Sequence, residues 1–187
     1  MEPYSKFLES AKASLHEFYA QHPHIDASHG EAHALRVLYH AIEAVACVGN
    51  AAVAAWGTDV VLAVLLAALL HDVDDRKYFQ SVDDGSDPYP NARRILTSID
   101  HLSADTINAT LAMIALVSCS ANGNTVPADI AATGRHHYLI PRWSDRLEAV
   151  GAVGVVRCYQ YTVAKGQPLS RYFHPHTEPP TPAVQPH

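Results

Sequence analysis

An unbroken apolar run that ends in a His-Asp pair is the feature that most limits how this chain can fold. Residues Val60–Leu70 are all apolar, and His71-Asp72 follows directly. A helix made of this run has no polar face, so it must lie in the core. Placing two polar, metal-binding side chains at the end of a core helix costs free energy, which indicates that the helix serves to position them. We interpret the pair as half of a metal site.

The same run lies in the only segment that resembles a membrane span. Residues 51–70 are interrupted by Gly57-Thr58-Asp59, and what remains is shorter than the roughly twenty apolar residues that a spanning helix needs. The N-terminal residues 1–6 lead into an amphipathic stretch, which differs from the apolar segment of a secretory signal. The sequence therefore predicts a soluble, cytoplasmic protein.

Helical spacing of apolar residues extends through most of the chain, and we find no alternating strand pattern. We expect an all-α fold, a compact single-domain bundle of about six or seven helices over residues 1–168. The expected helices cover residues 4–21, 28–48, 58–70, 91–99, 104–119, 128–133 and 141–164. Helix caps are expected at Ser28, in a capping box with Glu31, and at Thr58 or Asp59.

Two segments depart from this helical pattern. Residues 74–90 are rich in Asp, Pro and Gly, which predicts a surface loop of the kind that closes over substrate. Residues 169–187 are rich in proline and poor in apolar side chains, so we expect an extended or disordered tail.

Composition narrows the partners and the compartment. The formal net charge of −6 makes binding to a nucleic-acid backbone unlikely and favours a small soluble substrate. Cys47, Cys119 and Cys158 are far apart and have apolar neighbours, which predicts buried, reduced thiols. The sequence leaves open whether the protein forms a homo-oligomer.

A second half of the metal site is expected from the helix before the apolar run. His29 and His33 lie four residues apart and so share one helix face. A zinc-protease helix needs Glu directly after its first His, whereas Glu31 lies two positions on, which disfavours a protease. Arg36 follows His33 by three residues, near enough to meet an anionic substrate.

The last expected helix offers a further ligand. Asp145 falls in its first turns, and Gly151 and Gly154 follow on the same helix. Each glycine costs a helix about 1 kcal/mol relative to Ala, a cost that is usually offset by close packing. We expect these glycines to draw the helix of Asp145 against its neighbours.

Taken together, these elements resemble the HD-domain metal-dependent phosphohydrolase superfamily. The resemblance lies in the order of His33, His71-Asp72 and Asp145, with Arg36-Val37 after the first His and Asp145-Arg146-Leu147-Glu148-Ala149 at the end. The small stand-alone members are most similar, because the HD helix continues as His71-Asp72-Val73-Asp74-Asp75-Arg76-Lys77. The resemblance covers most of residues 20–170.

The resemblance implies a ligand set and a reaction. His33, His71, Asp72 and Asp145 would hold one divalent ion, which in the family is commonly manganese, magnesium, nickel, cobalt, iron or zinc. The implied reaction is hydrolysis of a phosphate ester or anhydride of a small molecule such as a nucleotide. A metal in such a site polarises a phosphoryl oxygen and activates water.

The same comparison suggests roles for five further residues. Arg36, Lys77 and Arg146 are candidates for neutralising phosphate oxygens. Asp75 and Glu148 are candidates for carrying protons or supporting the metal ligands. For the residues other than Arg36, a surface ion pair or a solvated loop charge is the alternative.

Other histidines leave alternatives open. His101 lies between the HD pair and Asp145, where two-metal members add ligands, and a di-iron oxygenase would need such additions. His136-His137 lies too close to Asp145 for that pattern, so we expect a single ion. His29 could support a ligand, align water or cap a helix, and a helical module with a purely structural metal is a third alternative.

Overall fold

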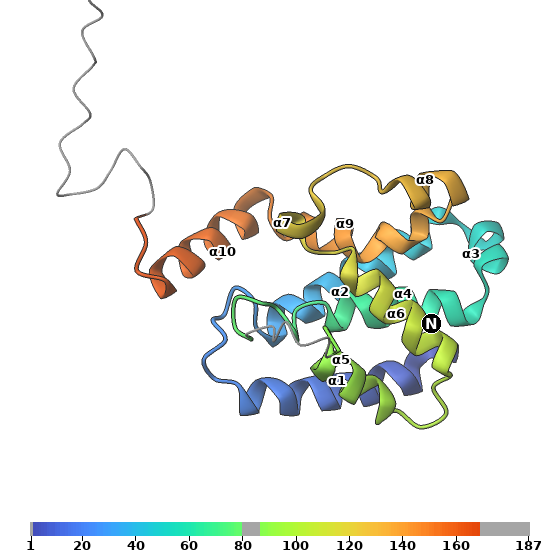
Figure 1. Ribbon diagram of the computed structural model, residues 1–187, viewed down its shortest axis with the longest axis horizontal. Coiled ribbons are helices and arrows are strands. Elements are labelled where there is room, and N and C mark those ends of the chain that lie inside the picture. The colour runs from blue at the N-terminus through green and yellow to red at the C-terminus, as the bar shows by residue number, and fades with distance from the viewer. Residues whose placement is uncertain (1, 80–86, 169–187) are drawn as a thin grey trace, which may run out of the picture.

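The chain is all-α throughout the part that the computed structural model describes, residues 2–79 and 87–168 (Figure 1). This confirms the expected fold class, although the described residues form more helices than expected. The α-helices are α1 (Glu2–Gln21), α2 (Glu31–Val48), α3 (Asn50–Trp56), α4 (Thr58–Leu70), α5 (Pro90–Thr97), α6 (Ala104–Ala115), α7 (Cys119–Asn122), α8 (Ala128–Thr133), α9 (Ile140–Leu147) and α10 (Gly151–Ala164), with a 3-10 helix at His136–Leu139.

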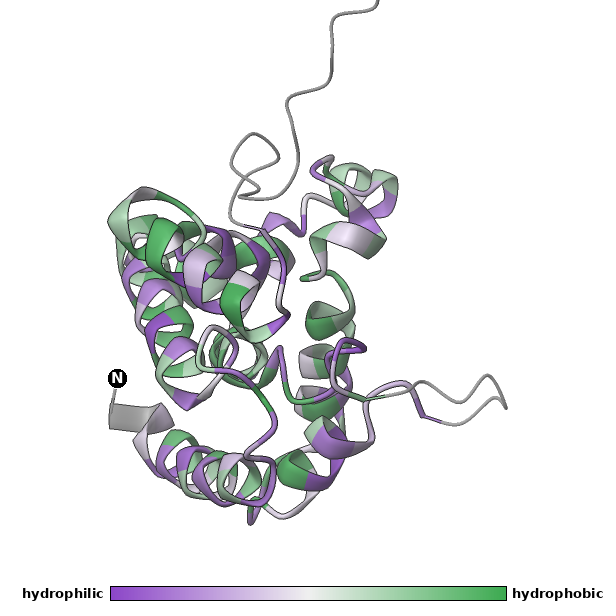
Figure 2. Ribbon diagram, turned by 90° about the vertical axis from the view of Figure 1, so that its left-hand side faces the viewer, coloured by the Kyte–Doolittle hydropathy of each residue, from purple (hydrophilic) through white to green (hydrophobic). Residues whose placement is uncertain are grey.

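Helix α4 forms the centre of the bundle, as its apolar sequence predicts. Every residue from Val61 to Leu70 is buried, and α1, α2, α6 and α9 all pack against this helix. The ribbons of the surrounding helices alternate between hydrophilic and hydrophobic residues, as expected of amphipathic helices (Figure 2). The central position of α4 fixes its C-terminal end, where His71 and Asp72 lie, inside the protein.

The predicted side-chain caps of α2 and α4 are wrong. Gly30 and Gly57 occupy the two N-cap positions without a side-chain hydrogen bond. Ser28 instead belongs to the preceding loop, where its hydroxyl and its amide both donate to the Asp26 carboxylate. Because this local turn uses the Ser28 hydroxyl, α2 begins three residues later than expected.

The predicted helix over residues 141–164 is also wrong, because it is broken between α9 and α10. Gly151 has a φ of +66°, a left-handed conformation that glycine adopts without strain. A Cβ on Gly154 would lie 2.4 Å from the carbonyl carbon and oxygen of Ala149. The two glycines therefore permit a sharp turn, after which α10 projects from the bundle (Figure 1).

Helix α6 ends at Ala115, four residues before the predicted end. Arg142, which is buried on α9, donates from Nε to the carbonyl oxygen of Leu116 at 2.6 Å. Its Nη1 donates to the carbonyl oxygen of Thr125 at 3.0 Å. These bonds hold the chain that follows α6 against α9 and replace the helical bonds of the last predicted turn.

Hydrogen bonds fix the described ends of the loop at residues 74–90. The Asp74 carboxylate accepts the backbone N–H groups of Asn91 and Ala92 at 3.0 and 2.8 Å, and so caps α5. Closure over substrate concerns residues 80–86, which lie outside the described residues, as does the predicted tail 169–187.

The prediction of buried cysteines is wrong, since Cys47, Cys119 and Cys158 are all exposed. For Cys158, apolar neighbours misled the prediction because α10 exposes much of its apolar surface; Val155 is 71% exposed and Val163 is 57% exposed. None of the described helices is by itself long and apolar enough to cross a membrane. Helices α2 and α3 have sufficient length and apolarity only when taken together, and the chain bends by 108° between them.

Candidate metal centre

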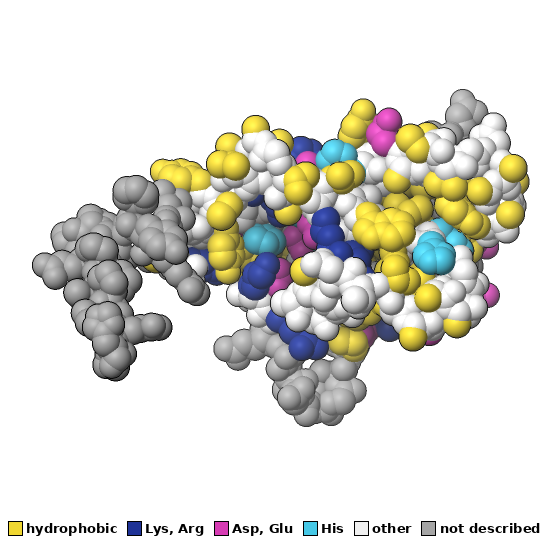
Figure 3. Space-filling model, turned by 90° about the horizontal axis from the view of Figure 1, so that it is seen from above, with side chains coloured by type: hydrophobic (Ala, Val, Ile, Leu, Met, Phe, Trp, Pro, Cys, Tyr) yellow, Lys and Arg dark blue, Asp and Glu magenta, His cyan; other side chains and the backbone are white. Residues whose placement is uncertain are grey.

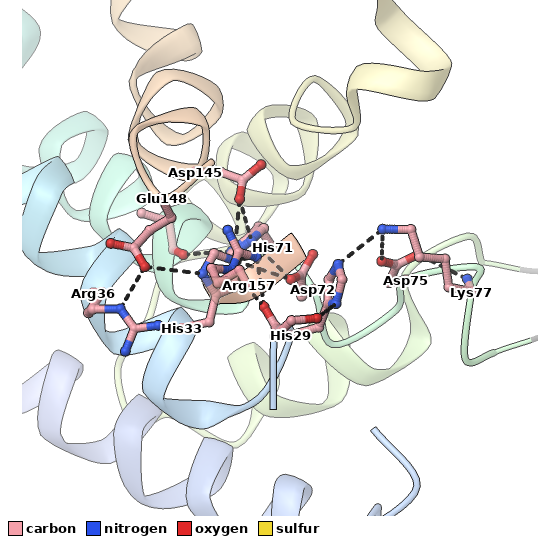
Figure 4. A network of polar contacts seen from close by, with 12 residues as sticks. His29, His33, Arg36, His71, Asp72, Asp75, Lys77, Asp145, Glu148 and Arg157 are labelled. Carbon is pink, nitrogen blue, oxygen red and sulfur yellow. Dashed lines mark hydrogen bonds and ion pairs between the residues drawn. The ribbon is translucent and has the colours of Figure 1, made fainter. Parts of the chain in front are cut away.

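His33, His71 and Asp72 bring one ligand atom each within 4.8 Å of one another (Figure 4). Asp72 Oδ2 lies 3.5 Å from His33 Nε2 and 3.2 Å from His71 Nε2. Asp145 completes the group from α9, with its Oδ1 atom 3.3 Å from His33 Nε2 and 3.7 Å from His71 Nε2. The structure therefore brings together all four residues predicted as metal ligands.

The helices that carry these residues meet at one place. α2, α4 and α9 pack against one another in all three pairings. His33 lies in the first turn of α2, and His71 directly follows the last residue of α4. Side chains from separate helices converge because these three helices share the core.

Three buried polar atoms in this group have no hydrogen-bond partner. They are Nδ1 of His33, Nε2 of His71 and Oδ2 of Asp72, and the last two face each other. Nδ1 of His71 is 3.0 Å from the carbonyl oxygen of Ala68, which can only accept, so Nδ1 carries a proton and Nε2 points to the carboxylates. Two imidazoles, two carboxylates and unpartnered atoms between them fit a divalent cation.

The charges of the group are strongly coupled. Burial alone would lower the pKa of His71, but the carboxylates of Asp72 and Asp145 outweigh burial and raise this pKa well above its usual value. Burial alone would raise the pKa of Asp145, but its interactions with the His33 and His71 rings hold this pKa far below its usual range. In the metal-free protein an imidazolium thus supplies the positive charge between the carboxylates.

Glu148, the residue that follows α9, lies next to Nδ1 of His33, the ring nitrogen that faces away from Asp72 and Asp145. Its Oε2 atom lies 3.9 Å from Nδ1 of His33 and accepts a hydrogen bond from Arg36 Nε at 2.6 Å, while Oε1 lies 2.9 Å from His40 Nε2. Burial would raise the pKa of Glu148, but the bonds from Arg36 and His40 lower it. Glu148 is therefore an ionised, buried carboxylate, and Arg36 is held by it on the side of His33 away from Asp72.

Arg157 is a residue of this site that the sequence did not reveal. Its Nη2 atom lies 3.0 Å from Nε2 of His33, and its Nε and Nη2 atoms donate to the carbonyl oxygen of Ser28 at 2.9 and 2.7 Å. Burial lowers the pKa of His33, so its Nε2 is an acceptor for this guanidinium. Arg157 faces the candidate ligand His33 because the chain turns between α9 and α10. The continuous helix predicted over residues 141–164 gave no reason to expect Arg157 at this site.

Arg157 also lines a cavity of about 230 Å³ that opens beside the metal ligands. The other lining residues are Ser28, His29, Ala149, Gly154, Cys158 and Tyr161. Seen from above, Lys and Arg side chains surround a hollow in which a His and acidic side chains are exposed (Figure 3). Through Arg157, the wall of this cavity contacts the candidate ligand His33.

His29 and Lys77 lie together at the edge of this cavity. Lys77 Nζ is 3.0 Å from His29 Nε2 and 3.4 Å from Asp75 Oδ2. His29 Nδ1 lies 2.8 Å from Ser28 Oγ and 3.2 Å from the hydroxyl of Tyr78. Asp75 also accepts the backbone N–H of Lys77, so it shapes the loop that presents the lysine.

The remaining candidates lie elsewhere. Arg146 donates from Nη2 to the carbonyl oxygen of Gly123 at 2.7 Å, which ties α9 to the turn after α7. His101 is exposed in a turn with a φ of +64°. The ring of His137 stacks on Trp56 with centroids 4.8 Å apart. Among residues 2–79 and 87–168, only His33, His71 and Asp72 form a group of this kind, and neither His101 nor His136-His137 adds to it.

Comparison with known proteins finds similarity to a viral protein. An uncharacterized protein of Acanthamoeba polyphaga mimivirus is 38% identical over 112 residues, which cover 54% of this chain and 42% of the viral protein. The chain thus spans less than half the length of this relative. No family model matches the chain. No solved structure matches it either.

Proposed function

We propose that the protein is a metal-dependent phosphohydrolase that acts on a small phosphorylated molecule such as a nucleotide. The observation that carries the proposal is the convergence of His33, His71, Asp72 and Asp145 around unpartnered buried atoms. The cavity lined by Arg157, at the side of His33, supports the same proposal. The resemblance of these motifs to HD-domain hydrolases favours phosphate chemistry.

The four ligands would hold one divalent ion. When bound, such an ion supplies a Lewis acid that polarises a phosphoryl oxygen and activates water. The ligands themselves bind as deprotonated groups, so the proton on Nε2 of His71 must leave when metal binds.

Arg157 is the cation placed to bind the phosphoryl group. A guanidinium offers several N–H donors in one plane, which match the oxygens of a phosphate. The carbonyl oxygen of Ser28 holds two of these nitrogens, so the guanidinium stays at the cavity wall when its contact with His33 is exchanged for substrate. In this proposal Arg157 takes the role that the sequence suggested for Arg36, Lys77 and Arg146.

Glu148 orients His33 in this scheme. A metal at Nε2 requires the proton of His33 on Nδ1, and the carboxylate of Glu148 faces that atom. Carboxylates that accept from metal-bound imidazoles fix the tautomer and the ring orientation. Since Glu148 is buried and ionised, we assign it this support in preference to proton transfer.

The test combines turnover with metal analysis. Purified protein loaded with manganese is incubated with a panel of phosphate monoesters and nucleotides, and released phosphate is measured. We expect Asp72→Asn to lower both bound manganese and turnover, the latter by at least about 100-fold. Asp100→Asn, at an exposed position between α5 and α6, is the matched control and should retain both.

Two results would overturn the proposal. One is a metal-saturated wild-type protein that releases phosphate from none of the substrates. The other is equal turnover by wild type and Asp72→Asn at the same protein concentration.

A further inference from the structure

Three cationic side chains gather around the ring of Tyr161, which lines the cavity. Lys77 Nζ lies 5.6 Å from the ring centroid and Lys165 Nζ lies 5.8 Å from it. Lys165 Nζ is also 4.9 Å from the ring of Tyr78. Arg157 precedes Tyr161 by one helical turn on α10 and lines the same cavity. This cluster of positive charge stands out in a chain whose formal net charge is −6.

The positive charge of the cluster is only partly neutralised. Lys77 pairs with Asp75 at 3.4 Å, and its other close contact, His29, is held neutral because burial, with the nearby Lys77 charge, lowers its pKa. Within the described part of the chain, Lys165 and Arg157 form no ion pair with a carboxylate. Clustered cations at a concave surface attract anions and hold them there.

The cations occupy two places, Arg157 in the cavity wall and the lysines next to His29 and Tyr161, which also line it. Arg157 touches the metal ligand His33, whereas Lys77 touches His29, whose ring centroid lies 6.3 Å from that of His33. The ring of His29 is also 5.7 Å from that of Tyr161. One position for an anion therefore lies beside the metal ligands at Arg157, and a second lies on the far side of the His29 ring, next to Lys77 and within reach of Lys165 beside Tyr161.

We propose that the cavity selects phosphorylated molecules that carry a second anionic group. The phosphoryl group would lie at Arg157 and the metal ligands, and the second group, a phosphate or a carboxylate, would lie near Lys77 and Lys165, beside the Tyr161 ring. A short spacer, favourably a planar one, would pack against Tyr161. The inference rests on the proposed function for the first group and adds the second.

Binding measurements with stable phosphonates test this inference without requiring turnover. Phenylphosphonate has one anionic group, 4-carboxyphenylphosphonate has a carboxylate at the far side of the ring, and 1,4-phenylenediphosphonate has a second phosphonate there. Their affinities are measured by calorimetry on manganese-loaded and metal-free protein. Because the ring is rigid, its two groups cannot chelate one ion, so a gain in affinity reports a second contact.

We expect a second anionic group to tighten binding by about fivefold at low salt, since each exposed lysine contributes modestly. The gain should disappear in Lys77→Met/Lys165→Met and shrink for wild type at high ionic strength. Lys6→Met, which removes one lysine charge at an exposed position near the N-terminal end of α1, should retain the gain. The carboxylate and phosphonate probes show which anion is preferred.

The outcomes separate this inference from the proposed function. Tight phenylphosphonate binding with no gain from a second anionic group, or a gain that survives in the double variant, overturns the second-anion position and leaves the hydrolase proposal intact. A lysine-dependent gain in a protein that hydrolyses nothing supports the position and overturns the hydrolase. Failure of all three probes to bind overturns the inference.

Discussion

Each imidazole of the candidate metal centre turns Nε2 toward the carboxylates because its Nδ1 atom faces a different acceptor. For His71 this acceptor is the carbonyl oxygen of Ala68, one turn back on α4. For His33 it is Glu148, whose Oε2 atom at 3.9 Å is slightly beyond hydrogen-bond distance. The protein therefore fixes the orientation of both rings without a bound ion, which lowers the entropy that metal binding must cost.

The role of Glu148 can be tested by Glu148→Gln. The substitution keeps the size of the side chain and removes the charge that faces His33 Nδ1, so we expect manganese affinity to fall by about tenfold. Affinity is measured by competition with a chromophoric chelator, and Glu43→Gln, exposed on the same helix as His33, serves as control. Lower thermal stability with unchanged affinity would show that Glu148 only holds Arg36 and His40 in place.

A pH-dependent contribution to stability is expected from Asp26. Burial alone would raise its pKa, but hydrogen bonds from Ser28 and Tyr78 lower it below the usual 3.8. The stabilisation is therefore complete above about pH 4 and is lost as the pH falls through the lower pKa of the folded protein. We expect Asp26→Asn to cost about 1–2 kcal/mol of unfolding free energy at pH 6, through charge-assisted hydrogen bonds.

Urea unfolding of wild type and Asp26→Asn at pH 6 and at pH 3 measures this contribution. The difference between the two proteins should shrink at the lower pH, where the wild-type carboxylate becomes protonated. A difference that is the same at both values would mean that the charge of Asp26 contributes nothing. Asp100→Asn again provides a control with the same change of side chain.

Among the helices, α4 could be predicted from the sequence and the break before α10 could not. The apolar run of α4 has one physical solution, burial on all sides, and this fixes where His71 and Asp72 lie. At residues 148–150 the apolar spacing continues across the break, and what interrupts the helix is the backbone at Gly151 and the close approach at Gly154. The convergence of His33, His71, Asp72 and Asp145 was thus predictable, whereas the place of Arg157, which depends on the direction of α10, was not.

Gly154→Ala tests whether this close approach holds α10 in place. The added Cβ would meet the carbonyl of Ala149 at 2.4 Å, and only Gly154 and Thr162 of α10 are buried, so the helix should shift away from the cavity. We expect a local cost of about 1–3 kcal/mol, seen as faster amide exchange across α10, together with weaker phenylphosphonate binding.

The matched control for this prediction is Ala152→Ser, which changes an exposed position in the first turn of the same helix. It should leave both amide exchange and binding unchanged. If Gly154→Ala showed the same amide exchange and the same phenylphosphonate affinity as wild type, the turn at residues 148–150 could widen without moving Arg157.

At the scale of the whole molecule, stability and the cavity depend on different parts of the chain. The core surrounds α4, while α10 supplies much of the cavity wall from outside the bundle (Figure 1). Hydropathy alone did not separate the two, because α10 is apolar on its exposed face as well. This is also why the burial of Cys158, which lies on α10, was predicted wrongly.

Two substitutions that shorten a side chain test whether stability depends on the core around α4 and little on α10. Leu65 on α4 is fully buried, so we expect Leu65→Ala to lower the free energy of unfolding by about 2–5 kcal/mol. Val163 on α10 is 57% exposed, and Val163→Ala should change it by less than about 0.5 kcal/mol. Urea denaturation followed by circular dichroism measures both, and comparable losses would contradict the division.

Because α10 lies outside the core, the exposed thiol of Cys158 on this helix can be labelled with a dye. Cys158 lies on α10 and lines the cavity, so a fluorophore attached there would sense ligand entry directly. Replacing Cys47 and Cys119 with serine would leave a single attachment point, since these two are also exposed and α4 contributes no cysteine. The protein thus carries its own position for a reporter dye, and screening for its natural ligand need not wait for an assay of turnover.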